Sequence, residues 1–188
     1  MFGDYAGTAA AGVLIQHGGN DHPTGLADLQ GRRFVVSSET GESGKLNEEQ
    51  VKALTGGDTI TARRMRQDFY QFQPTHQLIL QTNHKPRVTG TDDGIWRRIR
   101  LIPFTVKFTG NRKDVTLPER LNAELSGILT WAVMGWHWYR AEGFKATPAA
   151  VTAATDEYRE SSDAIGAFLA DCCTVDKALS AKAGDRKS

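Results

Sequence analysis

The sequence predicts an α/β fold, in which a core of parallel strands is followed by an α-helical C-terminal section. Two short β-prone runs, at residues 32–38 and 77–82, have the length and composition of buried strands. Helical patterns lie between them and then dominate the last third of the chain. We therefore expect a core over residues 1–113, a helical section over 114–176 and a disordered tail over 177–188.

The composition is that of one ordinary globular domain. The 188 residues are enough to bury a core, and 39% of them are hydrophobic and 24% charged. No apolar run is long enough to cross a bilayer, and the N-terminus lacks the pattern of a signal peptide. The two cysteines, Cys172 and Cys173, are adjacent, which suits neither a disulfide between them nor a zinc site. We expect a cytoplasmic protein with no membrane partner.

The first predicted core strand spans residues 32–38. Its continuous run Phe34-Val35-Val36 is typical of a parallel strand that is covered on both faces. Residues 1–31 before it are weakly patterned and carry loop signals. After it, a helix is expected from Asn47, which can cap the first turn, to the Gly56-Gly57 pair that ends it.

Two more core strands and a hairpin are predicted in the middle of the chain. Residues 59–61 and 69–72 are β-prone and indicate a hairpin or an extended excursion between core strands. Residues 77–82 form the second core strand, and residues 99–106 are predicted to form the third. The sheet would then contain three strands with helices between them.

Three helices are predicted for the C-terminal section. Residues 116–142 carry apolar side chains at a spacing of three to four, and Gly143 ends this pattern. A second helix is expected to start after Thr147-Pro148 and to run to about Glu160. Ser162 or Asp163 can cap a third, because both side chains accept hydrogen bonds from a first helical turn.

The net charge of +1 hides a basic middle. Residues 60–113 contain 11 Lys and Arg against three acids, a local balance of +8, so the remainder of the chain carries −7. This concentration suggests a local site for an anion, either the phosphate of a nucleotide or the backbone of a nucleic acid. The alternative is a solvated face with scattered counterions.

Two polar residues stand at the ends of predicted core strands. Glu39, at the carboxyl end of the first, could hold Mg²⁺ through water or polarise an attacking water. Asn83, after the second, could orient a nucleophilic water or touch a γ-phosphate without adding charge. The alternatives are a surface contact for Glu39 and plain turn chemistry for Asn83.

Arg97 and Arg98 precede the predicted third strand. Arginine suits phosphate because its planar fork bonds two oxygens at once. On a strand, adjacent residues face opposite sides, so one of the two would point into a given site. The other would pair with Asp92, Asp93 or a neighbouring subunit, and ordinary surface ion pairing is the alternative for both.

A basic cluster surrounds aromatic residues in the predicted hairpin. Arg63, Arg64 and Arg66 lie close to Phe69 and Tyr70, a combination that suits contact with a nucleic-acid backbone and base stacking. Lys85 is a further candidate for DNA binding. The alternative is a solvated hairpin.

Residues 41–45, Gly-Glu-Ser-Gly-Lys, follow a strand and precede a helix, as a phosphate-binding P-loop does. The pattern G-x-x-x-x-G-K-[ST] is not met, because Glu39 stands where a glycine is needed and Leu46 where the Mg²⁺-binding hydroxyl belongs. No other stretch of the sequence fits the pattern. We therefore do not interpret this segment as a P-loop.

Six sequence words occur in the order in which one known family carries them. They are GDY at 3–5, RFVVSSET at 33–40, LTGGDTITAR at 54–63, TNHKP at 82–86, GIWRR at 94–98 running to IPF at 102–104, and GILTWA at 127–132. Over residues 3–172 the chain thereby resembles the helicase domain of the phage and plasmid primase–helicase family, the poxvirus-type NTPases of helicase superfamily three.

The resemblance implies an AAA+-like core and an ATP-driven DNA helicase, with Mg²⁺ as cofactor. The protein would act as a homo-oligomeric ring, a hexamer, on single-stranded or forked DNA. Glu39 matches the Walker B acid and Asn83 the polar sensor, while Arg98, with Arg97 second, matches the finger that reaches a neighbour's ATP. The stretch from 56 to 66 matches the segment that places a DNA-contacting hairpin in the channel.

One departure from the family pattern qualifies this expectation. In the family the P-loop lies upstream of the GDY word, which here starts at Gly3. A P-loop supplies most of the phosphate-binding surface, so we expect weak or no ATP binding by this polypeptide alone. Two interpretations stay open: the C-terminal portion of a helicase that is active only in a complete protein, or a non-enzymatic remnant that binds DNA or joins a ring passively.

Overall fold

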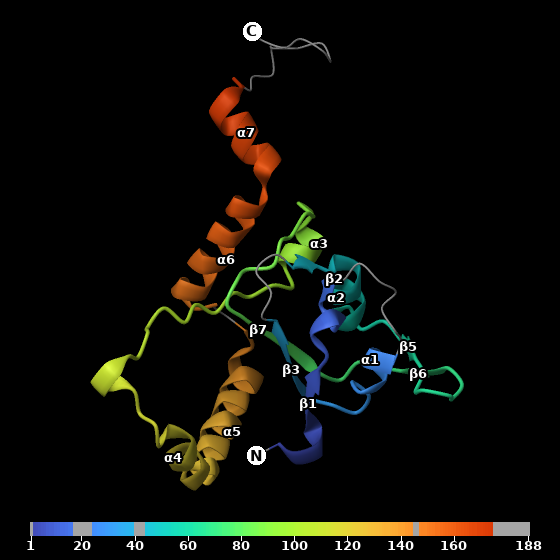
Figure 1. The fold of residues 1–188 in the computed structure, drawn as a ribbon, viewed down its shortest axis with the longest axis vertical. Helices are drawn as coiled ribbons and strands as arrows, with labels where there is room; N and C mark the ends of the chain where they lie inside the picture. Colours follow the sequence, from blue (N-terminus) through green and yellow to red (C-terminus); the bar gives the residue numbers. More distant parts are fainter. Residues whose placement is uncertain (1, 17–23, 40–43, 145–146, 175–188) are drawn as a thin grey trace.

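The computed structural model describes residues 2–16, 24–39, 44–144 and 147–174 (Figure 1). A three-stranded parallel sheet in the order β1-β3-β7 forms its centre, from β1 (Ala6–Ala9), β3 (Phe34–Glu39) and β7 (Gln77–Thr82). Helices dominate the C-terminal part of the chain. The predicted α/β class and the helical C-terminal section are therefore confirmed.

The two core strands predicted most clearly, now β3 and β7, pair along their whole length. Their register runs from Phe34 opposite Gln77 to Glu39 opposite Thr82. The other edge of β3 pairs with β1, in parallel, although the sequence of β1 has no clear strand pattern. The central strand of the sheet is thus the one that ends in Glu39.

One face of the sheet packs on the main hydrophobic core. Val35 of β3 is buried there, with the half-buried Leu78 of β7 packed against the same cluster. The short α1 (Thr24–Ala27) and α2 (Glu48–Thr55) contribute buried residues to this core. The predicted cap of α2 is confirmed, since the Asn47 side chain accepts a hydrogen bond from the Gln50 N–H at 3.2 Å.

The opposite face of the sheet carries no such core in the described part of the chain. Phe34 and Val36 point to this face and are half-buried, and Ile79 beside them is 40% exposed. The prediction that the Phe34-Val35-Val36 run is covered on both faces is therefore wrong. Only alternate residues of the run reach the core, because side chains on a strand alternate between faces.

Two small antiparallel pairs flank the parallel sheet. β5 (Ile60–Ala62) and β6 (Tyr70–Phe72) form the predicted hairpin. β2 (Ile15–Gln16) pairs with β4 (Lys45–Leu46). Two 3₁₀ turns, η1 (Gly3–Tyr5) and η2 (Ala11–Val13), lie before these pairs in the chain.

The predicted third core strand at residues 99–106 is wrong. A short helix, α3 (Asp93–Trp96), precedes this segment, which pairs with no strand among the described residues. Ile99 and Leu101 pack beside a second core cluster, and the chain then leaves the body of the protein. A strand needs a partner for its backbone groups, and this segment has the side-chain pattern without the partner.

The predicted C-terminal helices form, with one interruption. The prediction of a single helix over residues 116–142 is wrong. The segment forms two helices, α4 (Leu117–Ala123) and α5 (Leu125–Glu142), which are separated at Glu124. α6 (Ala149–Ser162) and α7 (Ala164–Cys172) follow as predicted, and Asp163 caps α7 by accepting a hydrogen bond from the Gly166 N–H at 2.8 Å. A further 3₁₀ turn, η3 (Gly110–Arg112), precedes α4. The predicted tail at residues 177–188 lies outside the described residues.

α6 is fixed to the body by a second core cluster. Tyr158 of α6 and Trp96 of α3 meet edge to face, with ring centroids 5.3 Å apart, and both are buried. The Tyr158 hydroxyl donates a hydrogen bond to the carbonyl of Pro86, which follows β7. None of the described helices is both long enough and apolar enough to span a membrane.

Candidate functional site

The carboxyl ends of β3 and β7 form one edge of the sheet, because Glu39 lies opposite Thr82 in the register. Asn83 follows directly, so the structure brings the backbone positions of the two predicted polar residues together. The Asn83 side chain is exposed and has no hydrogen-bond partner among the described residues. Open α/β sheets bind ligands outside the carboxyl ends of their strands, and this edge is the candidate site.

The turn after β7 displays Asn83. The Thr82 hydroxyl donates to the carbonyl of His84 at 2.6 Å and accepts from the His84 N–H at 3.2 Å. These two bonds close the chain around Asn83, and no hydrogen bond to a described residue uses its amide. The Thr82 side chain therefore makes the turn. The turn does not use the Asn83 side chain, which is left available for a ligand.

The chain segments that follow β3 and β7 are hydrogen-bonded to each other. The Arg87 N–H donates to the Gly44 carbonyl at 2.9 Å, and the Leu46 N–H donates to the Arg87 carbonyl at 2.9 Å. This forms an isolated parallel bridge between Lys45 and Arg87. Lys45 begins the short β4, and residues 41–43 of the rejected P-loop segment lie outside the described residues. Backbone bonds therefore fix the shape of this edge.

Glu48, in the first turn of α2, holds the loop that leads from this edge to α3. Its carboxylate accepts from the Thr89 N–H at 2.8 Å, from the Thr89 hydroxyl at 3.1 Å and from the Gly90 N–H at 2.9 Å. Burial alone would raise the pKa of Glu48, but these hydrogen bonds outweigh it and lower that pKa. Sequence reasoning missed this residue, because its partners are 41 and 42 positions away.

The Arg98 side chain is hydrogen-bonded to other residues of its own chain. Its Nε donates to the Thr55 hydroxyl at 3.1 Å and its guanidinium to the Gly94 carbonyl at 2.5 Å. Arg97 is exposed, and its side chain has no partner among the described residues. Both follow α3 in a turn, so the argument from alternating strand faces does not apply to them.

The predicted pairing of one arginine with Asp92 or Asp93 is also corrected. Lys52 of α2 pairs with Asp92 at 3.0 Å, and its hydrogen bond lowers the pKa of the Asp92 carboxyl. Arg159 of α6 pairs with Asp93 at 2.6 Å. These acids fasten α2 and α6 to the start of α3.

The β5–β6 hairpin presents its basic residues on an exposed loop. The guanidinium of Arg63 stacks over the Phe69 ring at 4.9 Å. Arg64 is exposed and lies 3.9 Å from Asp28, which is a weak surface pair. Arg66 is exposed with a φ of 59°, a left-handed conformation that places it at the tip of a turn. Figure 1 shows this hairpin on the opposite side of the sheet from α4 and α5.

Lys85 lies between the candidate edge and α6. Its Nζ is 3.4 Å from a carboxylate oxygen of Glu157 and 5.7 Å from the centre of the Tyr158 ring. The lysine is exposed, so it keeps access to solvent while it contacts α6. Of the predicted DNA-binding residues, Lys85 is the one that is not on the hairpin.

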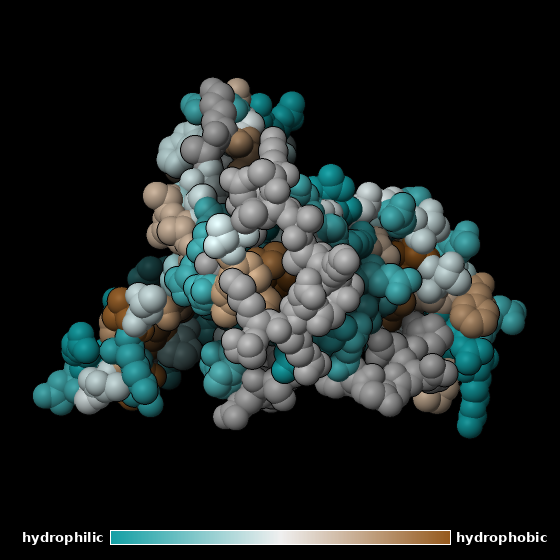
Figure 2. All heavy atoms as spheres, turned by 90° about the horizontal axis from the view of Figure 1, so that it is seen from above, coloured by the Kyte–Doolittle hydropathy of each residue, from teal (hydrophilic) through white to brown (hydrophobic). Residues whose placement is uncertain are grey.

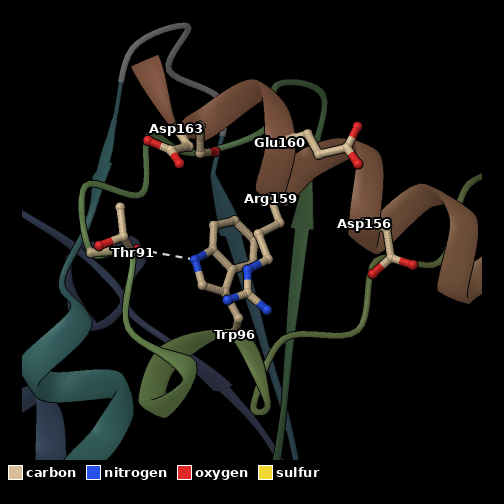
Figure 3. A pocket seen from close by; sticks show the side chains of 8 residues that line it. Thr91, Trp96, Asp156, Arg159, Glu160 and Asp163 are labelled. Carbon is tan, nitrogen blue, oxygen red and sulfur yellow. Dashed lines mark hydrogen bonds between the residues drawn. The ribbon is translucent and has the colours of Figure 1, made fainter. Parts of the chain in front are cut away.

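A pocket of about 370 Å³ lies between α6 and the loop before α3. Figure 3 shows Trp96 at its base, with Arg159, Asp156, Glu160 and Asp163 around it. The Trp96 indole donates to the Gly90 carbonyl at 3.0 Å, which joins the pocket to the loop that Glu48 holds. In the part of the chain that the structure describes, no group of three or more His, Cys, Asp and Glu could hold a metal ion.

The chain is similar to one described family and to several proteins of large DNA viruses. Residues 1–98 match the family described as "Family of unknown function (DUF5906)". The chain is 32% identical over 163 residues to "Putative helicase L207/L206" of Acanthamoeba polyphaga mimivirus, which covers 78% of this chain and 17% of that protein. It is 26% identical over 159 residues to "Putative primase C962R" of African swine fever virus, with 76% and 16% covered.

A third relative matches a shorter part of the chain. "Putative helicase 184R" of Invertebrate iridescent virus 6 is 34% identical over 95 residues, which cover 48% of this chain and 10% of that protein. The chain spans about a sixth of the length of the mimivirus and African swine fever virus proteins. Because the family model matches more than half of the chain, the chain belongs to the DUF5906 family.

Proposed function

We propose that this chain forms part of an ATP-dependent DNA helicase with an AAA+-like core, which works in a ring of the superfamily-three type. The observation that carries the proposal is the shared edge where β3 and β7 end, with Glu39 and Asn83 in neighbouring positions. The six matching words and the printed names of the viral relatives support it. The proposal does not require that the protein comes from a phage or a plasmid, since these relatives belong to large DNA viruses.

The residues at this edge suit ATP and Mg²⁺ only in part. A carboxylate followed along the edge by a neutral amide is a fitting donor set for a hydrated Mg²⁺ and an attacking water. Glu39 would hold or polarise the water, and Asn83 would orient it against the γ-phosphate. The phosphate cradle must come from a P-loop on another polypeptide segment, because the G-x-x-x-x-G-K-[ST] pattern does not occur in these 188 residues.

Arg97 and Arg98 have different roles in this proposal. The resemblance points first to Arg98 for the group that reaches a neighbouring ATP site. Its hydrogen bonds to Thr55 and Gly94 hold it inside its own subunit, whereas Arg97 is exposed and has no described partner. We therefore propose that Arg97 reaches the ATP site of a neighbouring subunit. Arg98 instead positions α3 against α2. An arginine at the transferred phosphate stabilises the charge that develops there.

Single-stranded or forked DNA is the proposed polymer partner. Arg64 and Arg66 at the exposed hairpin loop would contact phosphates, and Phe69 with the stacked Arg63 would meet a base. Lys85 would add a phosphate contact near the nucleotide edge. The hairpin begins at Ile60, shortly after α2 ends at Thr55.

The test of the enzymatic proposal is reconstitution. The chain is mixed with a polypeptide that carries the P-loop segment of a viral relative, and ATP hydrolysis is measured with and without single-stranded DNA. We expect DNA-stimulated hydrolysis in the mixture. Glu39→Gln should lower the rate by at least about 100-fold, the range for loss of a general base. Glu49→Gln, an exposed carboxylate on α2, is the matched control and should hydrolyse normally.

The arginine assignment has its own variants in the same mixture. Arg97→Ala should abolish most hydrolysis, while DNA binding is retained. Arg98→Ala should lower hydrolysis less and should lower the thermal midpoint, because it removes two intramolecular hydrogen bonds. Full activity of Arg97→Ala would refute the assignment and return the role to Arg98.

A second candidate function is a non-enzymatic subunit that binds DNA or joins a ring passively. The exposed basic hairpin favours it, since that feature needs no nucleotide. This function predicts salt-sensitive DNA binding by the chain alone and no hydrolysis in any reconstituted mixture. The presence or absence of DNA-stimulated hydrolysis therefore separates the two candidates.

A further inference from the structure

Lys45 and Arg87 lie opposite each other where the segments that follow β3 and β7 meet. They are the partners of the isolated parallel bridge, in which the Arg87 N–H and carbonyl bond to the residues on either side of Lys45. Neighbouring parallel strands lie roughly 4.8 Å apart, which sets the separation of the two Cα atoms. The bridge is made by backbone atoms alone, so it leaves both side chains available for other contacts.

The two side chains point to the same side of the bridge, into solvent. Bridge partners share a face, and successive residues alternate between faces. Lys45 and Arg87 are both exposed, whereas Leu46, Pro86 and Val88 beside them are buried. Leu46 and Val88 enter the second core cluster. The alternation therefore directs both cations outward and next to each other.

Neither cation has a counterion in the described part of the chain. No ion pair or hydrogen bond joins either side chain to a described residue. Glu48, three residues after Lys45, instead holds the loop before α3, and Lys85, two residues before Arg87, pairs with Glu157. Like charges at opposite positions of paired strands destabilise the pairing. An anion between Lys45 and Arg87 would offset that repulsion.

The pair lies at the candidate edge. It follows the carboxyl ends of β3 and β7, and Arg87 comes four residues after Asn83. Lys45 is the last residue of the Gly-Glu-Ser-Gly-Lys segment, which does not fit the P-loop pattern but still brings a lysine to this edge. Lysine binds phosphate as a point charge, and arginine binds two of its oxygens through a planar fork. The two residues together suit a compact phosphate anion.

The position of the pair favours a polyphosphate over a nucleic-acid backbone. Adjacent phosphates of a polyphosphate share one oxygen, so two neighbouring side chains can converge on them, whereas a sugar separates the phosphates of a DNA strand. The hairpin proposed to contact DNA leads into the amino end of β7, and the pair lies beyond its carboxyl end. Small ligands of open α/β sheets bind at the carboxyl end.

We propose that Lys45 and Arg87 bind the phosphate groups of a nucleotide at the edge that carries Glu39 and Asn83. The Lys45 ammonium and the Arg87 guanidinium hold one phosphate or two adjacent phosphates from the solvent side. Neither residue belongs to the six sequence words, so the resemblance does not assign them. The inference rests on the nucleotide edge of the proposed function, and it adds a phosphate subsite that this chain supplies without a P-loop.

The test measures the binding of inorganic pyrophosphate to the chain alone, by heteronuclear NMR titration at constant ionic strength. EDTA is present, so that no metal ion bridges the anion to Glu39. The unaltered chain should bind with a dissociation constant of about 1 mM, and the amide signals of Lys45 and Arg87 should shift. Lys45→Ala and Arg87→Ala should each weaken binding about 10-fold, because each removes one charged partner of the anion. Arg87→Lys, which keeps the charge, should weaken it less than Arg87→Ala.

The matched controls remove the same charges elsewhere. Arg112 ends η3 and Lys113 follows it, and both are exposed. They belong to the segment that projects from the body, seen at the left of Figure 1 and of Figure 2. Lys113→Ala and Arg112→Ala should bind pyrophosphate as the unaltered chain does. Equal weakening in these controls would mean that net charge, and not the Lys45–Arg87 pair, attracts the anion, which would overturn the inference.

Two further results would overturn the subsite. One is the absence of saturable binding by the unaltered chain up to about 10 mM pyrophosphate. The other comes from anisotropy with single-stranded DNA: if Lys45→Ala and Arg87→Ala weaken DNA binding as strongly as pyrophosphate binding, the pair contacts DNA. DNA-stimulated hydrolysis in the reconstituted mixture would support the helicase proposal even then. Pyrophosphate binding that depends on the pair, without any such hydrolysis, would support the subsite and refute the enzymatic proposal.

Discussion

Replacing Tyr158 by Phe should destabilise the protein, because one buried carbonyl group then loses its hydrogen-bond donor. The Tyr158 side chain is 6% exposed, and its hydroxyl is a hydrogen-bond donor to the buried Pro86 carbonyl. Phe keeps the ring contact with Trp96 but leaves that carbonyl without its donor. An unsatisfied buried polar group costs about 1–3 kcal/mol. For a chain of this length, about 2 kcal/mol lowers the thermal midpoint by roughly 4–8 °C.

The assay compares three variants by thermal and urea unfolding. Tyr158→Phe should lose about 2 kcal/mol, and Tyr158→Ala should lose about 3–5 kcal/mol because a cavity is added to the lost hydrogen bond. Tyr139→Phe, an exposed tyrosine on α5, is the control and should stay within about 0.5 kcal/mol. A midpoint for Tyr158→Phe equal to that of the control would refute the role of the Pro86 carbonyl and the docking of α6.

The same tyrosine predicts a pH dependence. Burial, with the nearby negative charge of Glu48, raises the pKa of Tyr158 to about 12 from its ordinary value of 10.0. The folded state therefore keeps this proton longer than the unfolded state does. Its contribution to stability is complete below pH 10.0 and is lost as the pH rises toward about 12. Tyr158→Phe should lack this part of the alkaline decrease.

Three further predictions concern stability and DNA binding. Ile95→Ala, at a fully buried site, should cost about 2–5 kcal/mol in urea unfolding. Glu48→Gln should cost about 1 kcal/mol and remove the share of Glu48 in the acid-side loss of stability, since the lowered pKa of Glu48 gives stability that disappears as pH falls through it. Arg64→Ala with Arg66→Ala should lower the slope of log affinity against log salt by roughly 1.4 in anisotropy with single-stranded DNA, while Arg112→Ala should not.

These predictions have clear contrary outcomes. An Ile95→Ala protein as stable as the unaltered chain would mean that α3 is not packed in the core. An unchanged acid limb in Glu48→Gln would assign that limb to other carboxylates. Equal salt slopes for the hairpin double variant and Arg112→Ala would show that the basic loop does not contact phosphates.

Local sequence signals were sufficient where the structure is determined locally. The cap at Asn47, the cap at Asp163 and the β5–β6 hairpin depend on residues close together in the chain, and all three form as predicted. β3 and β7 were also predictable, because each is rich in β-branched or long apolar residues. In these cases propensity and tertiary structure agree.

The errors arose where a distant partner decides the structure. β1 has the sequence Ala-Gly-Thr-Ala, which has little strand propensity, and it is a strand because it pairs with β3. Residues 99–106 have the propensity but no described partner, so no strand forms. The division of the long helix at Glu124 has no sequence signal that we can identify.

The sequence was enough to predict which residues lie at the candidate site, but not which residues hold the surrounding loops and helices in place. Glu39 and Asn83 could be placed at strand ends by pattern alone, and the register of β3 and β7 brings those ends together. The roles of Glu48, Trp96 and Tyr158 depend on contacts across 41, 6 and 72 positions, of which only the Trp96 contact is local. Periodicity does not contain such information, because it describes faces of elements and not the pairs between them.

The bonds of Arg98 give the hairpin a mechanical link to α3. Arg98 holds Thr55, the last residue of α2, and the hairpin begins only a few residues later at Ile60. From that root, three strand residues and the loop extend roughly 15 Å at about 3.3 Å per residue. A tilt of about 10° at the root therefore moves the loop by roughly 2–3 Å, comparable to the length of a hydrogen bond. A small adjustment of α3 would therefore be enough to make or break the phosphate contact that we propose for Arg66.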